Sequence, residues 1–338
     1  MHIEEAMKSA TRSVLRYPGS KARLARFIAD AILLNRLDRP VFVEPFTGGA
    51  SVSIALLEAN IVEEVALNDM DPLLAAFWKC VFSLEDAKWL ADTVMEIPLS
   101  IEEWERQKTL TPVGVRENAL KCLYLNRTSF SGLLHSSAGP IGGRRQTKWT
   151  IGCRFNRQKL SSRILELSGL RNRVSAVTQS GWMECCEIWN GAKNVLFYLD
   201  PPFYHKADRL YRYTFSNEEH EALRDYMVIL KTPWILSYDN AGEIRLLYDR
   251  LGLNARIIDN TYCAHPIGGN SFIGREVLYS NLGQLPFPSE SQSDHVGLSV
   301  RPIVMSGRSG AELVVRLHFQ RNQHVGDDEM GEASSVAL

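Results

Sequence analysis

The tetrapeptide Asp200-Pro201-Pro202-Phe203 directly follows an apolar run at 195–199. These residue types suit the activation of an amino nitrogen conjugated to a ring, which is a poor nucleophile because its lone pair is delocalised. A carboxylate and a backbone carbonyl that accept its two N–H hydrogens draw that lone pair out of conjugation. Prolines fix φ and donate no N–H, so their carbonyls stay available as acceptors, and an aromatic side chain can stack on the ring. The alternative is an ordinary Asp-Pro turn after a strand, so the surrounding sequence has to decide.

A glycine-containing turn, Glu44-Pro45-Phe46-Thr47-Gly48-Gly49, stands between an expected strand at 41–44 and an expected helix at 50–59. Backbone N–H groups at such a helix start favour a carboxylate or phosphate. Asp69 ends the next expected strand, at 65–68, where an acid can accept hydrogen bonds from both ribose hydroxyls of a nucleoside cofactor. This pair fits S-adenosylmethionine or a dinucleotide. The missing third glycine of a G-x-G-x-x-G frame favours S-adenosylmethionine.

Strands and helices alternate along most of the chain, which predicts a doubly wound α/β sheet. The segment at 85–125 has a helical pattern, and the glycine-rich stretch Gly132–Gly152 predicts a loop or hairpin. Ser216 looks like a helix cap. Further strands are expected at 174–178, 194–199, 233–238, 256–262, 276–280 and, as a strand-like piece, 313–319.

Composition is that of an ordinary globular protein, with 338 residues, 45% hydrophobic and 23% charged. No apolar run approaches the roughly 20 residues of a transmembrane helix. The N-terminal residues lack the apolar core of a signal peptide. The six cysteines form no C-x-x-C pair and have no ligand-like spacing with histidine. We therefore expect a cytoplasmic enzyme with no metal and no membrane contact.

Positive charge is concentrated in one part of the sequence, although the net charge is only −1. Between Arg116 and Arg173 there are twelve Lys and Arg but two acidic residues, with aromatic residues interleaved. A basic segment on an otherwise acidic chain is typical of a surface that binds a polyanion. A plain solvated basic surface is the alternative, and the size of the excess favours nucleic acid.

Taken in order, these motifs resemble the N6-adenine DNA methyltransferases of the Dam-like class, also called the D12 or α class, over about residues 14–283. Residues 15–21 resemble the N-terminal cofactor motif of that family, and 44–49 resemble its E-P-F-x-G-x turn. Asn68-Asp69 is similar to its D-x-N-type element, and residues 200–203 stand where the family has D-P-P-[YF]. Leu125-Asn126-Arg127-Thr128-Ser129-Phe130-Ser131-Gly132 closely resembles its L-N-R-x-x-[FY]-[NS]-G block.

The resemblance implies a Rossmann-like S-adenosylmethionine-dependent methyltransferase sheet with an inserted target-recognition region, mainly helical plus a hairpin. Residues 12–84 would be the cofactor-binding part and 85–173 the DNA-binding insert. Residues 174–283 would be the catalytic part, and 284–338 a partly disordered C-terminal extension.

The resemblance also implies roles for individual residues. The catalytic residues would be Asp200, Pro201, Pro202 and Phe203. The S-adenosylmethionine-binding residues would be Tyr17, Lys21, Glu44, Phe46, Gly48, Asp69 and Asp200. The DNA-binding residues would be Asn126, Arg127, Arg144, Arg145, Lys148 and Arg154, and no metal would be bound.

The implied reaction is site-specific methyl transfer from S-adenosylmethionine to N6 of an adenine flipped out of double-stranded DNA. Phe203 stands where the family more usually has tyrosine. A phenylalanine can still stack on a base but lacks the tyrosine hydroxyl. Residues 139–146 do not match the hairpin expected of a GATC enzyme, so that target does not carry over. The biological role stays open among restriction-modification, with a cognate restriction endonuclease as partner, phage defence and epigenetic marking.

Other functions compete with this one. The N4 amino group of cytosine, the N6 amino group of adenine in RNA and the side-chain amide of protein glutamine are also conjugated nitrogens. Enzymes for cytosine N4 more often carry Ser at the position of Asp200, and enzymes for glutamine more often carry Asn, so Asp200 favours adenine. A DNA-binding relative without catalysis is a further alternative. The intact Asp200, Gly48, Asp69 and Lys21 argue against it.

Overall fold

The computed structural model describes residues 13–16, 21, 24–146, 148–205, 212–262 and 272–287. All of them fall within one compact unit, Met1–Pro288. The predictions made for Tyr17 and for a strand near 313–319 lie outside the described residues.

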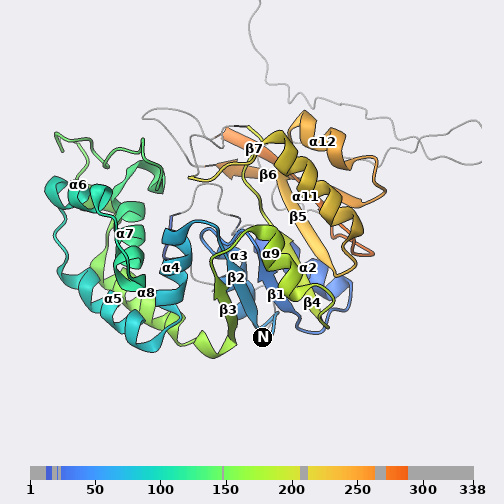
Figure 1. Cartoon of the computed structure of the whole chain (residues 1–338), viewed down its shortest axis with the longest axis horizontal. Coiled ribbons are helices and arrows are strands. Elements are labelled where there is room, and N and C mark those ends of the chain that lie inside the picture. The colour runs from blue at the N-terminus through green and yellow to red at the C-terminus, as the bar shows by residue number, and fades with distance from the viewer. Residues whose placement is uncertain are drawn as a thin grey trace, which may run out of the picture. The chain divides into compact units, whose positions relative to one another are not determined.

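A seven-stranded sheet forms the centre of this unit (Figure 1). Its order is β3-β2-β1-β4-β5-β7-β6, and only β7 runs antiparallel to its neighbours. The expected α/β sheet is confirmed, and each strand predicted among the described residues is present. The strands are β1 (Val41–Glu44), β2 (Val65–Asn68), β3 (Val174–Thr178), β4 (Val195–Leu199), β5 (Trp234–Asp239), β6 (Asn254–Tyr262) and β7 (Phe272–Ser280).

The strand order reverses between β1 and β4. The chain runs outward from β1 through β2 to β3, then returns to place β4 on the other side of β1. These two parallel neighbours pair in register, with Phe42 opposite Leu196 and Val43 opposite Phe197. In open α/β sheets, ligands bind outside the carboxyl ends of the strands at such a reversal. The turn after Glu44 and the Asp200 tetrapeptide therefore emerge side by side.

Helices flank the sheet and begin where the sequence places caps. Asp71 accepts a hydrogen bond from Leu73 at the start of α4, and Ser216 and Glu219 form a reciprocal capping box at the start of α11. The described helices are α2 (Leu24–Leu34), α3 (Ser51–Glu58), α4 (Pro72–Val81), α5 (Leu84–Glu96), α6 (Ile101–Thr109), α7 (Val115–Thr128), α8 (Arg157–Ser168), α9 (Trp182–Trp189), α11 (Asn217–Ile229) and α12 (Gly242–Tyr248).

The core lies on both faces of the sheet because side chains alternate along each strand. In β4, Leu196 and Tyr198 join one hydrophobic cluster, and Phe197 and Leu199 join the other. The first cluster packs α2, α3 and α4 against the sheet, and the second packs α9, α11 and α12.

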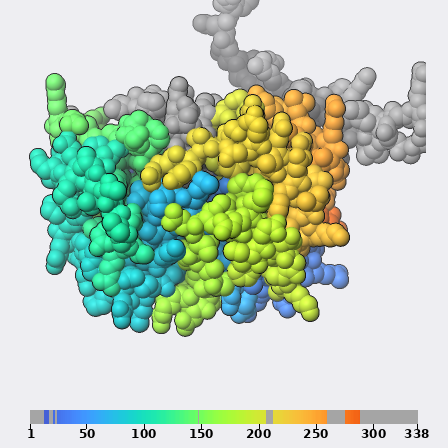
Figure 2. Space-filling model, viewed as in Figure 1, coloured from blue at the N-terminus to red at the C-terminus, as the bar shows by residue number. Residues whose placement is uncertain are grey.

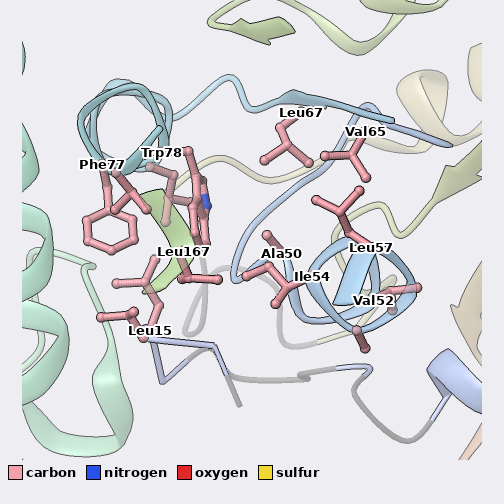
Figure 3. Packing of buried hydrophobic residues seen from close by; sticks show 14 of the residues in the cluster. Leu15, Ala50, Val52, Ile54, Leu57, Val65, Leu67, Phe77, Trp78 and Leu167 are labelled. Atoms are coloured by element: carbon pink, nitrogen blue, oxygen red, sulfur yellow. The ribbon is translucent and has the colours of Figure 1, made fainter. Parts of the chain in front are cut away.

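The helices of the predicted DNA-binding insert belong to the first of these clusters. Figure 1 shows α5, α7 and α8 gathered beside α4 on the side of the sheet where β3 is the edge strand. Figure 3 shows Leu167 of α8 near Trp78 of α4, with Ala50 and Ile54 beyond. Helices α5, α7 and α8 thus share one continuous core with α2, α3 and α4.

Of the loop or hairpin predicted around 132–152, the described residues form a loop. Ser129 and Pro140 make an isolated antiparallel bridge, turns follow to Gln146, and Ile151–Arg154 is a short 3₁₀ helix. Gln146 explains this geometry: its amide donates to the carbonyls of Ile141 and Gly143 and accepts from the N–H of Ile151. These side-chain bonds close a compact loop in place of a strand ladder.

The last described residues pack onto the body of the unit. Leu285 is buried, Arg256 donates to its carbonyl, and Asn35 donates to the carbonyl of Gln284. Of the helices the structure describes, none is long and apolar enough to cross a membrane.

Candidate active site

A cavity of about 260 Å³ opens at the carboxyl edge of the sheet, where the strand order reverses. The turn after β1, the start of α4, the end of β4 and the segment 212–215 all contribute to its wall. Its lining includes Lys21, Glu44, Phe46, Gly48, Asp69, Asp71, Tyr198, Asp200, Pro202, Arg212 and Phe215. Most of the predicted cofactor and catalytic residues are therefore brought together.

The turn after β1 is held open by Asp69. One carboxylate oxygen accepts the N–H of Gly48 at 2.8 Å, and the other accepts the N–H of Asp71 at 2.9 Å. Gly48 has a φ of 47°, in the left-handed region that glycine adopts without steric cost. Trp78 donates to the Gly48 carbonyl at 2.9 Å and fixes the turn from the other side.

Asn68 ties together three neighbouring strand ends. Its buried amide donates to the carbonyls of Pro45, after β1, and Ser180, after β3. Its side-chain oxygen accepts from Thr178 and from the N–H of Ser180. The amide thus links the ends of β1, β2 and β3, a role that the motif resemblance did not predict.

Burial perturbs the acids of this region. It raises the pKa of Glu44 to about 8, although Ser53 donates to that carboxyl at 2.6 Å and opposes the shift. It also raises the pKa of Asp69 to about 7, opposed by the two backbone N–H donors. Carboxyl groups that favour the neutral form in an empty cavity become charged more readily beside a cation. The cavity is therefore suited to a positively charged ligand.

Asp200 is held rigidly at the end of β4. Ser237 of β5 donates to Oδ1 at 2.8 Å and itself pairs with the hydroxyl of Tyr198 at 3.0 Å. Lys21 places its ammonium 2.8 Å from Oδ1 and 2.9 Å from Oδ2. Burial raises the pKa of Asp200, Lys21 lowers it, and Glu276 raises it.

Lys21, predicted to bind the cofactor, also pairs with Asp200. Its side chain is 4% exposed, spans both oxygens of Asp200, and lies 3.6 Å from a carboxylate oxygen of Glu276. Its ammonium is also 5.1 Å from the centre of the Phe203 ring. Lys21 lines the cavity, but its closest described charged partner is Asp200.

The rest of the tetrapeptide continues from the cavity wall into the following loop. Pro202 lines the cavity, and Phe203 follows it half-buried. Asp239, at the end of β5, accepts the N–H of Tyr204 at 3.0 Å. This bond fixes the chain direction directly after the tetrapeptide.

The segment after this loop covers one side of the cavity. Arg212 pairs with Asp71 at 2.6 Å, and the rings of Phe215 and Phe46 meet edge to face at 5.7 Å. Figure 2 shows the yellow atoms that follow β4 lying against the blue atoms near the start of α4. Two contacts therefore join the segment 212–215 to the β1 turn and to the start of α4 across the cavity.

The prediction that Asn126 and Arg127 bind DNA stays a prediction, and most of the contacts described for their side chains are with the N-terminal segment. Asn126 is fully buried; its amide accepts from the N–H of Arg16 at 2.7 Å and donates to the carbonyls of Arg16 and Gly132 at 2.9 Å each. Arg127 donates to the carbonyl of Val14, and burial, with Arg16 nearby, lowers its pKa to about 10. Both side chains anchor the N-terminal segment against α7.

Several basic side chains of the segment 116–173 are already bonded to other groups of the protein. Arg163 pairs with Glu58 at 2.7 Å, Arg157 donates to two backbone carbonyls, and Arg173 to three. Arg144, one of the predicted DNA contacts, is exposed and pairs with Glu105. Four exposed basic side chains lack a hydrogen bond or ion pair to any described residue: Arg145, Lys148, Arg154 and Lys159.

Two site residues carry a sequence signal that motif reasoning missed. Ser237 lies inside the buried run of β5, and Glu276 begins the buried run of β7. A polar residue at a core position of a strand usually has a functional reason. No group of three or more His, Cys, Asp or Glu arranged to hold a metal ion is found among the residues that the structure describes.

Comparison with known proteins supplies the family. A search of curated proteins finds no match. A sequence model of the D12 class N6 adenine-specific DNA methyltransferases matches residues 17–262. This stretch contains the glycine turn, Asp69, the L-N-R block and Asp200, and it spans well over half of the 338 residues. The chain therefore belongs to the D12 class N6 adenine-specific DNA methyltransferase family, whose members methylate adenine in DNA.

Proposed function

We propose that this chain transfers a methyl group from S-adenosylmethionine to N6 of an adenine flipped out of duplex DNA. The observation that carries this proposal is the carboxylate of Asp200, held by Lys21 and Ser237 at the wall of a cavity where the strand order reverses. Family membership makes the enzyme a methyltransferase acting on DNA adenine. The cofactor, the flipping step and the individual residues are the proposal.

The cavity fits S-adenosylmethionine in charge and in chemistry. The cofactor carries a sulfonium, an ammonium and one carboxylate, so its net charge is positive, and the lining includes the carboxyls of Glu44, Asp69, Asp71 and Asp200. A carboxylate has about four acceptor positions. Asp69 uses two for backbone N–H groups, which leaves the others for the ribose hydroxyls. Bound there, the cofactor supplies an electrophilic methyl group.

Asp200 has an acceptor position left for the substrate. Oδ1 receives Ser237 and Lys21, whereas Oδ2 receives Lys21 alone among the described residues. Oδ2 can therefore accept one N6 hydrogen. The carbonyl of Pro201 accepts no hydrogen bond from any residue that the structure describes, so it can take the other. Together they pull the N6 lone pair out of the ring and direct it at the methyl group.

Phe203 provides the surface on which the flipped base stacks. It lies next to Pro202, which lines the cavity, and its ring is within 5.1 Å of the Lys21 ammonium. Stacking a base on an aromatic ring is worth about 1–3 kcal/mol, which offsets the few kcal/mol that flipping costs. The acceleration of methyl transfer then comes from positioning and electrostatic stabilisation. The methylated adenine cation loses its proton to water.

DNA contacts come from the exposed part of the insert. Arg145, Lys148 and Arg154 are exposed and have no described partner, so their charges are available to phosphates. Trp149 and Phe130 are about half exposed, at 51% and 52%. Basic side chains with exposed aromatic neighbours suit a surface that holds a distorted duplex.

The test is incubation with methyl-labelled S-adenosylmethionine and duplex DNA, RNA or protein, followed by nucleoside and amino-acid analysis. Label in N6-methyladenine from DNA is expected. Label only in N4-methylcytosine, RNA or a glutamine side chain would refute the proposal in favour of one of those substrates.

Two variants assign the chemistry to Asp200. Asp200→Ala should abolish transfer while cofactor binding stays largely intact. Asp92→Ala is the matched control, because Asp92 is an exposed carboxylate paired with Lys88 on α5. It should transfer at the wild-type rate. Near wild-type transfer by Asp200→Ala would exclude the assigned role.

A further inference from the structure

A short loop at 131–138 follows α7 in the predicted DNA-binding insert, and Figure 1 shows this stretch of chain beside α6. Two backbone hydrogen bonds close the stem of the loop. Phe130 donates to the carbonyl of Gly139 at 2.9 Å, and Ile141 donates to the carbonyl of Thr128 at 2.8 Å. Contacts within the loop decide how the side chains beyond this stem are presented.

The ammonium of Lys108 holds the far end of the loop. From α6 it donates to the carbonyls of His135 and Ala138, at 2.9 Å each. It also lies 5.2 Å from the centre of the Trp104 ring, one helical turn earlier. An ammonium has three N–H donors, so a single side chain on a helix can fix two carbonyls of the loop at once.

Trp104 supports the near end of the same loop. Its buried indole N–H donates to the hydroxyl of Ser129, in the stem, at 3.1 Å. Residues four apart lie on the same face of a helix. Helix α6, which packs against α7, therefore presents Trp104 to the stem and Lys108 to the end of the loop.

The residues that Lys108 holds carry groups able to read bases. The N–H of Ser137 donates to Nδ1 of His135 at 3.2 Å, and the Ser137 hydroxyl lies 2.8 Å from the same nitrogen. Because Nδ1 accepts, the hydrogen of the neutral imidazole is on Nε2, which is then a donor. Ser136 and Ser137 are exposed, and His135 is half-buried. Hydroxyl and imidazole groups can form hydrogen bonds with the base edges in the grooves of DNA.

Reading by hydrogen bonds demands that such groups be held to within about 0.5 Å. A loop outside a helix or sheet has no ladder of backbone bonds to provide that precision. In this loop, the bonds from Lys108 to the carbonyls of His135 and Ala138 provide it on both sides of the exposed serines.

We propose that Lys108 is a positioning residue for target recognition: its ammonium fixes the 131–138 loop so that the polar groups of the loop meet the bases beside the target adenine in one geometry. This inference rests on the proposed function. It assigns selectivity among DNA sequences to a residue of α6, outside the L-N-R block and outside the cavity lining.

Two substitutions of Lys108 separate its donors from its bulk. Lys108→Met keeps much of the side-chain length and loses the donors, and Lys108→Arg keeps both the positive charge and N–H donors. Lys108 is half-buried, so water can reach the two carbonyls in its place and Lys108→Met should fold. Lys88→Met is the matched control, because Lys88 is an exposed helical lysine that pairs with Asp92 on α5.

The assay measures sequence selectivity directly. Each protein methylates a pool of DNA duplexes in which the bases on both sides of a fixed adenine are randomised, with S-adenosylmethionine as the donor. Sequencing of the N6-methyladenine positions gives the relative kcat/KM for every neighbouring base. The dissociation constant for S-adenosylmethionine and the thermal midpoint are measured on the same preparations.

Wild type should prefer particular bases beside the adenine by about tenfold or more, which is typical of the cost of one wrong base pair. Lys108→Met should reduce that preference at least about fivefold at one or more positions and leave the dissociation constant for S-adenosylmethionine within about threefold of wild type. Lys108→Arg should keep the preference within about threefold, and Lys88→Met should match wild type.

Wild-type selectivity in Lys108→Met would overturn the inference, as would an arginine variant that is as unselective as the methionine one. Failure of Lys108→Met to fold or to bind S-adenosylmethionine would also overturn it, because Lys108 would then support the whole structure and not the loop. A wild-type chain that methylates adenine without regard to the neighbouring bases would overturn the inference and leave the proposed function standing. A wild-type chain that forms no N6-methyladenine would overturn the proposed function itself.

Discussion

Removing the ammonium of Lys21 tests the charge arrangement of the active site directly. Lys21→Met keeps much of the side-chain length and removes the ammonium that lies 2.8 Å from Asp200 and 3.6 Å from Glu276. Removing one partner of a buried ion pair costs about 3–5 kcal/mol, because it leaves an uncompensated charge. For a unit of this size that corresponds to a thermal midpoint lowered by about 5–8 °C at neutral pH.

The loss should depend on pH in a defined direction. Lys21 lowers the pKa of Asp200, so the variant raises it further above its ordinary value. A carboxyl with a raised folded pKa binds more protons in the native state than in the unfolded state. Its stability contribution is therefore present at low pH and is lost as pH rises from about 3.9, the unfolded value, through the folded pKa. The difference between wild type and variant should be small at pH 5 and largest at pH 8.

Thermal unfolding of both proteins from pH 5 to pH 8.5 measures this difference. Lys88→Met is the control, since Lys88 forms an exposed pair with Asp92 and is 72% exposed. Such pairs contribute at most about 1 kcal/mol, so its midpoint should stay near wild type at each pH. A Lys21→Met midpoint close to wild type at pH 8, or a deficit that does not change with pH, would refute the reasoning.

Three further predictions concern other parts of the protein. Because the pKa of Glu44 is raised to about 8, the stability of the wild-type protein should fall as pH rises from about 4.5 through 8. Glu44→Gln should remove this contribution, so its thermal midpoint should fall less steeply with pH. An unchanged dependence of the midpoint on pH would contradict this prediction. Asn126→Ala should cost about 2–3 kcal/mol of unfolding free energy, from three buried hydrogen bonds, and leave the salt dependence of DNA binding as it was. Single replacements of Arg145, Lys148 and Arg154 by Ala should each make the slope of log DNA affinity against log salt concentration shallower by about 0.9. The thermal midpoint of each variant should stay at the wild-type value. Wild-type slopes in all three variants would exclude them as phosphate contacts.

The order and type of the elements were predictable because they depend on local patterns. Short apolar runs followed by polar turns predicted β1, β2, β4 and β5, and Ser216 marked the start of α11. The sequence left a loop and a hairpin open within 132–152, and the structure has a loop, in which the side chain of Gln146 bonds backbone groups that a strand ladder would otherwise use.

Residue types alone did not separate structural roles from binding roles. The L-N-R block looked like a DNA contact, yet Asn126 faces the backbone of Arg16 and Gly132, where a Cβ at residue 132 would come within 2.3 Å of the Arg16 carbonyl. The number of Lys and Arg in the segment could not show which arginines bind backbone carbonyls or acidic side chains of the protein itself. The partners of Arg157 and the Glu58 partner of Arg163 are more than 50 residues away in sequence.

The sequence by itself determined the family and the α/β fold, and a contiguous motif singled out Asp200 as the candidate substrate acceptor. The tertiary structure decided the electrostatics around that residue. Asp200, Ser237 and Glu276 are far apart in the chain and meet because β4, β5 and β7 are neighbours in the sheet. Lys21, just before α2, reaches Asp200 and Glu276 from outside the sheet. Hydrogen bonds and ion pairs act over a few ångströms, so only the folded chain specifies which charges Asp200 meets.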